Sequence, residues 1–331
     1  MTNSYSTIAD MLKQQDGDGN ITANIIEMLA PTCNLINDAH VSECNNKTSN
    51  ISVIRTSMPE PTFRTFYRGA AYTKSGVNQV TDTCGQLTDY SRVDKALCDI
   101  QKNPAQYRLN EAKAHLMGFQ KKIMQTLLYG DMKKDPLAID GFATRFGKKN
   151  TAENTVGKQI VDGGATGSTA CTSVFAITFG ENDAKLIYPE GTQAGIQHTD
   201  KGVETVHTSD GKAYEAYVDY YEWWVGLAVG NYKSSARLAN ISVEALRAGT
   251  VDCESLLLDL YYTIDEFREQ GINNTYLYAH PEFVKALHKK ILNKTNVNLT
   301  LDDVGGKKTV KFIDIPIRST REVSITETVV G

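Results

Sequence analysis

NPAQYRLNEAKAHLMGFQKKIMQTLLYG, residues 103–130, is the strongest secondary-structure signal in this sequence. Asn103 can cap a helix, Pro104 suits its first turn, and Gly130 can end it. Between these ends, apolar side chains recur every three or four positions, which predicts one apolar face on a single long helix (Leu109, Ala112, Leu116, Phe119, Ile123 and Leu127). At 1.5 Å per residue, this helix would span about 40 Å, which is long for a compact domain. We therefore expect it to run across the molecule as a support for other parts.

Before this helix, the sequence predicts a projecting hairpin. Strand-like runs at 52–58, 63–68 and 77–83 are separated by prolines and glycines and are too polar to bury a face of their own. Arginines are mixed there with aromatic residues, a composition enriched where proteins meet. The candidate intersubunit contacts are Arg55, Phe63, Arg64, Phe66, Tyr67, Arg68 and Tyr72. An ordinary surface hairpin is the alternative.

After the helix, β-forming residues and glycines dominate up to residue 241. The expected strands are 171–179, 184–188, 213–221 and 223–229, followed by helices at 253–270 and 281–293, a strand at 275–278, and strand-like runs at 310–317 and 322–329. The pattern of residues 8–29 predicts two short helical pieces around a Gly/Asp hinge, which is typical of an arm and not of a core. The order arm, hairpin, long helix, sheet and mixed elements predicts an α+β fold with segregated elements.

Composition excludes several classes of protein. The chain has 331 residues, 41% of them hydrophobic, and a net charge of −4. It lacks the basic excess of proteins that grip nucleic acid tightly. No apolar stretch reaches the roughly 18 residues that span a bilayer, and the polar N-terminus does not resemble a signal peptide. We therefore expect a soluble protein that is not secreted.

Cysteine spacing shows no metal ribbon or redox motif, and a metal shared by Cys33, His40 and Cys44 would lack a visible fourth ligand. Six cysteines are scattered with no CxxC pair, which favours reduced, structural thiols in a cytoplasm. A hydrolase using Cys171 or Cys253 as nucleophile is an alternative, although no base stands at a readable spacing from either cysteine.

Two motifs approach known binding loops without completing them. Residues 16–27 place oxygen ligands like a calcium loop, but Ile21 occupies the turn position that needs glycine. Residues 163–169 are glycine-rich but lack the lysine of a phosphate-binding loop. The histidines show no metal-ligand spacing, and the common catalytic motifs are absent from the sequence. We therefore predict no catalytic residues, no metal and no cofactor.

Five stretches, in this order, are similar to one family: IIEMLAPTCNLINDAHVSECNN (25–46), RTSMPEPTFRTFYRGAAYTKSGVNQVTD (55–82), LYGDMKKDPLAIDGFATRF (128–146), IYPEGTQAGIQHTDKG (187–202) and YYEWWVGLAVGNYKSSARLANI (220–241). In these stretches and their order, the chain resembles podovirus-type major capsid proteins of the Hong Kong 97 fold, a fold shared with encapsulins. The resemblance covers nearly the whole length.

The resemblance implies a division of the chain into five segments. These are an N-terminal arm (1–50), an extended E-loop (51–93), a peripheral domain with its spine helix (94–155), an axial domain with insertions (156–309), and return strands of the peripheral domain (310–331). Although Lys74 lies in the E-loop, we predict neither a lysine cross-link nor cleavage of an N-terminal segment.

The implied function is that of a major capsid protein without catalytic activity. Pentamers and hexamers of such a chain would close into an icosahedral shell around the double-stranded DNA of a tailed bacteriophage. Portal and scaffolding proteins would be its partners, with a cement protein as a further candidate and no membrane involved. The protein would be located in the virion capsid, which would be assembled in the host cytoplasm. An encapsulin-like nanocompartment shell is the nearest alternative, and the cysteine-dependent hydrolase is a more distant one.

Overall fold

The computed structural model describes residues 34–100, 103–152, 155–167, 170–265, 274–292, 299–304 and 307–331. The calcium-like loop at residues 16–27, with most of the expected arm, lies outside the described residues. Contacts divide the described chain into two compact units. The first contains Gln86–Ile123 and Gln193–Val225, and the second contains Thr32–Gly85, Met124–Thr192 and Gly226–Gly331.

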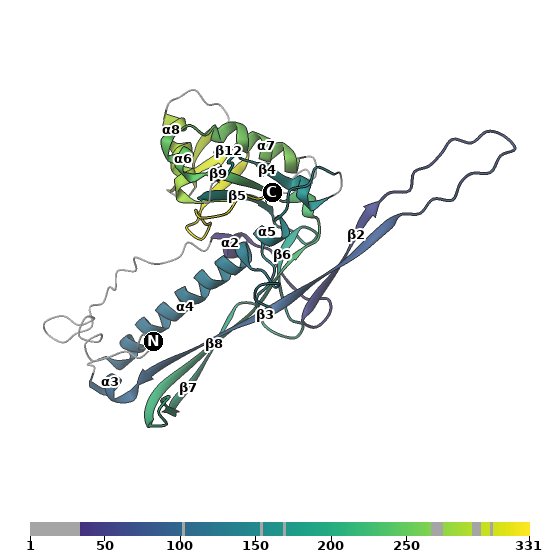
Figure 1. Ribbon diagram of the computed structural model, residues 1–331. Coiled ribbons are helices and arrows are strands. Elements are labelled where there is room, and N and C mark those ends of the chain that lie inside the picture. The colour runs from purple at the N-terminus through teal and green to yellow at the C-terminus, as the bar shows by residue number, and fades with distance from the viewer. Residues whose placement is uncertain are drawn as a thin grey trace. The chain divides into compact units, whose positions relative to one another are not determined.

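A seven-stranded sheet forms the centre of the second unit, in the order β11-β12-β13-β10-β5-β9-β4 (Figure 1). Its strands are β4 (Ile160–Asp162), β5 (Cys171–Thr178), β9 (Ala236–Ser242), β10 (Thr275–Ala279), β11 (Leu299–Val304), β12 (Lys307–Phe312) and β13 (Ile315–Ser319). β5 pairs antiparallel with both β10 and β9, and all eight of its residues are buried. A strand that is covered on both faces needs a run of apolar and β-branched residues, and Val174, Phe175 and Ile177 supply it.

Three helices pack on this sheet, namely α6 (Val243–Ala248), α7 (Cys253–Asp265) and α8 (Pro281–Leu292). Their apolar faces join the sheet in one core, in which Leu257 and Leu260 of α7 and Leu287 of α8 are fully buried. The helices expected to begin at residues 253 and 281, and the strand expected between them, are therefore confirmed.

The second unit also holds β1 (Val41–Glu43), β2 (Ser49–Ser57) and β6 (Ala184–Tyr188), together with parts of β3 (Gly76–Asp94) and β8 (Ala213–Val229). Their order is β1-β6-β8-β3-β2. Strands β8 and β3 approach so closely at Gly226 that a Cβ there would lie 2.8 Å from the Thr83 carbonyl oxygen. The short helical segments of this unit are α2 (Asn34–Asp38), α5 (Phe142–Arg145), η1 (Val156–Gln159) and η2 (Tyr232–Ser234).

The first unit is built on a two-stranded hairpin, in which β7 (Ile196–His207) pairs antiparallel with β8. Helix α3 (Lys95–Ile100) follows β3. A small apolar cluster forms its core, where Val93, Leu97, Cys98 and Tyr107 are buried and Tyr217 packs against them. The two strands expected at 213–221 and 223–229 are one continuous strand, because Glu222 stays paired in the β7–β8 register.

Helix α4 (Pro104–Tyr129) confirms the long helix. Gly130 follows its last residue, and a Cβ there would lie 2.1 Å from the Ile139 carbonyl oxygen, so only glycine fits. The apolar face expected from periodicity needs correction, since Leu109 is 50% exposed and Leu116 only partly buried. In the last two turns, more than one side of the helix is covered. The buried residues of α4 are Tyr107, Phe119, Ile123, Met124, Leu127 and Leu128.

Two expected strands are wrong. Residues 58–75 form no strand, because the Pro59–Glu60–Pro61 break leaves residues 63–68 without a partner strand. Residues 322–329 form no extended strand either, and their one bridge joins Glu327 to Cys171. Side chains, and not a backbone ladder, hold most of this terminal segment. No described helix is long and apolar enough to cross a membrane.

Candidate assembly surfaces

The hairpin loop, residues 58–75, joins β2 to β3 and is the first candidate surface. Strands β2 and β3 pair antiparallel from Ser49–Thr83 out to Ser57–Gly76, with a bulge between Arg55 and Ser57. The backbone N–H of Gly76 donates to Ser57 Oγ at 2.8 Å and closes the root of the loop. Figure 1 shows the loop extending beyond the paired strands. The two prolines that interrupt the loop keep it from continuing the ladder.

Aromatic side chains of this loop are fully exposed. Phe63 and Tyr72 have relative exposures of 109% and 105%, and Phe66 and Tyr67 are almost equally exposed. Met58, which sequence reasoning did not single out, is 82% exposed beside them. Monomeric proteins rarely expose a contiguous group of large apolar side chains. The loop therefore presents apolar surface that no described residue of the same chain covers.

The arginines among the candidate contacts lie on the same hairpin. Arg55 is exposed on β2, and Arg64 and Arg68 are exposed in the loop. A turn holds two of them, since Arg64 Nη1 donates to the Arg68 carbonyl oxygen at 3.3 Å and the Arg68 N–H to the Thr65 carbonyl oxygen at 3.3 Å. The structure thus brings all seven candidate residues onto one projecting hairpin.

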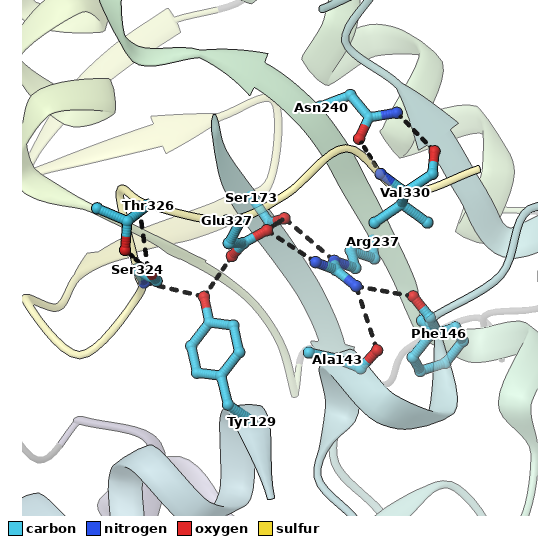
Figure 2. A network of polar contacts seen from close by, with 10 residues as sticks. All are labelled: Tyr129, Ala143, Phe146, Ser173, Arg237, Asn240, Ser324, Thr326, Glu327 and Val330. Carbon is cyan, nitrogen blue, oxygen red and sulfur yellow. Dashed lines mark hydrogen bonds and ion pairs between the residues drawn. The ribbon is translucent and has the colours of Figure 1, made fainter. Parts of the chain in front are cut away.

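A buried polar network fixes the end of the chain in the second unit (Figure 2). Arg237 on β9 and Glu327 form an ion pair at 2.7 Å, with 5% and 7% of the two side chains exposed. The hydroxyls of Tyr129 and Ser173 each donate to Glu327 at 2.5 Å. Burial, followed by the neighbouring Glu327 charge, raises the pKa of Tyr129 well above its ordinary value, so this hydroxyl stays protonated and donates.

The Nη1 and Nε atoms of Arg237 also donate hydrogen bonds. Its Nη1 donates to the carbonyl oxygens of Ala143 and Phe146 at 3.2 and 2.9 Å, and its Nε to Ser173 Oγ at 3.1 Å. Asn240 holds Val330 by two hydrogen bonds, one in each direction between amide and backbone. Sequence reasoning missed this network because no short-range spacing connects its members.

In the first unit, charged and aromatic side chains gather on the β7–β8 hairpin. Asp219 is buried and accepts from Arg108 Nη2 at 3.1 Å, and it lies 2.9 Å from His198 Nε2. Arg108 also pairs with Asp200 at 3.0 Å. A guanidinium shared by two carboxylates compensates the buried charge of Asp219, which is the condition under which such a charge is tolerated.

The cysteines proposed as nucleophiles are unsuited to catalysis. Cys171 and Cys253 are 0% and 1% exposed. Burial raises the pKa of Cys253 to about 11, so its reactive thiolate is scarce at neutral pH. Within the part of the chain that the structure describes, no group of three metal-ligating side chains could hold an ion. Neither cysteine is therefore placed as an accessible nucleophile.

Comparison with known proteins gives the family. The chain matches the model of the major capsid protein GP7 family over residues 16–331, and it belongs to this family. It is 30% identical to the capsid chain in a cryo-EM structure of bacteriophage Epsilon15, with a TM-score of 0.77 and coverage of 100% of this chain and 98% of that chain. The chain is thus a major capsid protein of a bacteriophage with the Hong Kong 97-type fold, a structural protein of the virion and not an enzyme.

More distant structures were also matched. The capsid of bacteriophage JBD30 is 11% identical, with a TM-score of 0.45 and coverage of 97% of this chain and 96% of that chain. The SrpI encapsulin of Synechococcus elongatus is 10% identical, with a TM-score of 0.42 and coverage of 72% and 96%. A search of curated protein sequences gives no match.

Proposed function

We propose that this capsid protein builds its shell by laying the hairpin loop, residues 58–75, over a neighbouring copy. The observation that carries the proposal is the full exposure of four aromatic rings, Phe63, Phe66, Tyr67 and Tyr72, on one loop. Burial of each ring against a partner would contribute about 2–3 kcal/mol. Part of this gain is lost to immobilising the loop, so each contact is modest. Many equivalent contacts in a closed shell then add up.

Charge on the loop indicates the surface that receives it. Arg55, Arg64 and Arg68 stand against one acidic residue of the same segment, Glu60, whereas the whole chain carries a net charge of −4. Arginine pairs with carboxylates through two parallel hydrogen bonds. The receiving surface on the neighbour is therefore acidic, with apolar patches for the rings.

The larger assembly follows the pattern expected from the family resemblance. Pentamers and hexamers of this chain close into an icosahedral shell around double-stranded DNA, with portal and scaffolding proteins as partners and a cement protein as a further candidate partner. The shell is assembled in the host cytoplasm. The five segments bounded at residues 50, 93, 155 and 309 serve as arm, E-loop, peripheral domain, axial domain and return strands. The net negative charge supports a wall that holds DNA without binding it tightly.

The decisive experiment removes the loop without harming the subunit. Replacing residues 59–74 with Asn-Gly spares the pairing of Ser52–Ser57 with Gly76–Val80, which a cut reaching residue 80 would destroy. We expect unchanged circular dichroism and melting temperature, and sedimentation as small oligomers instead of closed particles. Closed particles from this variant would overturn the proposal.

A control variant shows the result expected when the subunit itself unfolds. Leu116→Asp is unsuitable for this purpose, because Leu116 is only partly buried. Met124 is 0% exposed, and Met124→Asp should unfold the subunit by burying a charge. Within the loop, Phe63→Ser with Phe66→Ser should impair assembly, whereas Thr62→Ser with Thr65→Ser, equally exposed but small, should not.

A further inference from the structure

Two thiols lie in contact at the base of the hairpin. Cys44 follows β1, Cys84 lies on β3, and their sulfur atoms are 3.3 Å apart although the residues are 40 positions apart. Cys44 is 5% exposed in a small apolar cluster with Ile187 and Ala228, and Cys84 packs against that cluster. Both cysteines belong to the second unit.

The backbone holds each thiol in place. The N–H of Cys44 donates to the Tyr188 carbonyl oxygen at 2.9 Å, and the N–H of Cys84 donates to the Thr48 carbonyl oxygen at 3.0 Å. A disulfide bond is about 2.05 Å long, so the sulfur atoms need to approach by little more than about 1 Å. Both cysteines are free thiols in the structure.

We propose that Cys44 and Cys84 are a built-in oxidation site, which peroxides convert to an intrachain disulfide that closes the base of the hairpin. Two thiols and one hydrogen peroxide give one disulfide and two waters. The thiols lose two electrons and two protons, and the O–O bond of the peroxide is reduced.

The order of events follows from exposure. Cys84 is the more exposed of the two thiols, so its thiolate attacks a peroxide oxygen and becomes a sulfenic acid, releasing hydroxide. The Cys44 thiolate then attacks the Cys84 sulfur, the S–S bond forms, and a second hydroxide leaves. Both hydroxides take up the protons lost by the thiols. Because the two sulfur atoms are already 3.3 Å apart, the second step begins with its reacting atoms in contact.

Burial sets the pace of this reaction. Loss of solvent around the thiols raises the pKa of both Cys84 and Cys44 above the ordinary cysteine value. Thiolate is therefore scarce at neutral pH, and the pair stays reduced during assembly in a reducing cytoplasm. The particle meets oxidants for longer after release, when the bond would form.

The bond would constrain the segment that the proposed function uses. The ring closed between positions 44 and 84 contains β2, the hairpin loop and the start of β3. Closing a long loop stabilises a protein mainly by restricting its unfolded chain. Because both sulfur atoms belong to one copy, the disulfide can form whether or not the hairpin loop contacts a neighbouring copy.

The test treats intact wild-type particles with hydrogen peroxide. The particles are then denatured in excess N-ethylmaleimide, which blocks each free thiol as it becomes exposed, and unreduced peptides are analysed by mass spectrometry. We expect a Cys44–Cys84 linked peptide to account for most of the lost thiol. The melting temperature should rise by roughly 5 °C and return on addition of dithiothreitol. The rate should increase by up to about tenfold between pH 7 and pH 8, in proportion to thiolate.

Three variants sharpen the result. Cys44→Ser and Cys84→Ser should each abolish the rise in melting temperature, whereas Cys253→Ser, a buried thiol of the α7 core, should retain it. Sulfinic acid at Cys84 with Cys44 still free would overturn the proposal. So would disulfides between copies, seen as dimers on a non-reducing gel. The wild-type measurement decides even if a variant does not fold.

Discussion

The guanidinium of Arg237 lies 2.7 Å from the carboxylate of Glu327, although the two residues are 90 positions apart. Arg237 belongs to β9 of the seven-stranded sheet, and Glu327 belongs to the segment after the last strand. Both side chains are almost completely buried. A buried charge is tolerated only with its partner, so the terminal segment is an integral part of the fold.

Removing the carboxylate should therefore be costly. We expect Glu327→Ala to lower the free energy of unfolding by about 3–5 kcal/mol, because Arg237 would remain buried without a counter-charge. Glu327→Gln, which keeps an oxygen acceptor, should cost less. Urea denaturation of the isolated subunit, followed by circular dichroism, measures both changes.

An exposed ion pair provides the control. Lys212 and Asp210 pair at 3.2 Å with most of both side chains in water. Asp210→Ala should have no measurable effect, since water and salt already screen this pair. If Glu327→Ala were as mild as Asp210→Ala, the terminal segment would not be held by the network.

Local signals made part of this fold predictable. Pro104 and Gly130 mark the ends of α4, and the apolar run Trp223–Val229 marks the buried end of β8. Both signals could be found in the sequence because they depend only on neighbouring residues. Strand β6 has the bounds that its residues 184–188 predict. The strand-like runs at 52–58 and 77–83, separated by prolines and glycines, predicted the hairpin that β2 and β3 form.

Relationships between distant residues were not predictable. Residues 63–68 have the composition of a strand, but a strand needs a partner, and none of the described strands pairs with them. Neither the Arg237–Glu327 pair nor the Cys44–Cys84 contact corresponds to a recognisable spacing motif in the sequence. Periodicity also placed Leu109 on the buried face of α4, because it cannot tell which turns of a helix are covered.

Burial along α4 leads to a second prediction. Leu127 is 0% exposed and Leu109 is 50% exposed, although both belong to the same apolar periodicity. Leu127→Ala should lower the free energy of unfolding by about 2–5 kcal/mol by leaving a cavity, and Leu109→Ala by less than about 1 kcal/mol. Equal costs would mean that Leu109 is also buried in the folded subunit. Parallel denaturation curves of the two variants compare them directly.

Two glycines allow a test of backbone packing. At Gly226, a Cβ would lie 2.8 Å from both the Thr83 carbonyl oxygen and Ile187 Cγ1, whereas at Gly118 in α4 nothing lies within 4 Å. Gly226→Ala should therefore lower the melting temperature, at a cost of about 1–3 kcal/mol. Gly118→Ala should raise it, by up to about 1 kcal/mol of helix propensity. If the two glycine-to-alanine substitutions change the melting temperature in opposite directions, the loss at Gly226 is due to close contact between strands and not to a general effect of alanine.

A histidine caps helix α8 and makes this cap sensitive to pH. The N–H of Glu282 donates to His280 Nδ1 at 3.2 Å, and the N–H of Phe283 donates to the His280 carbonyl oxygen at 2.9 Å. Partial burial lowers the pKa of His280, with Arg247 and Arg321 acting in the same direction and Glu282 opposing them. The neutral ring is therefore the form that the folded state favours, and only that form can accept from Glu282.

Because the pKa of His280 is lower in the folded protein than in the unfolded chain, unfolding takes up a proton. Stability from the neutral ring is complete above the ordinary histidine pKa of about 6.5, and it is lost as the pH falls through that value towards the lowered one. We expect the wild-type subunit to lose more stability between pH 7.5 and pH 5.5 than His280→Asn, in which asparagine caps the helix without titrating. Urea denaturation across this range measures both proteins, and their difference removes the contribution of the other histidines. Identical pH profiles would show that His280 does not control the cap, whereas a steeper loss in His280→Asn would mean that the sign of its pKa shift is reversed.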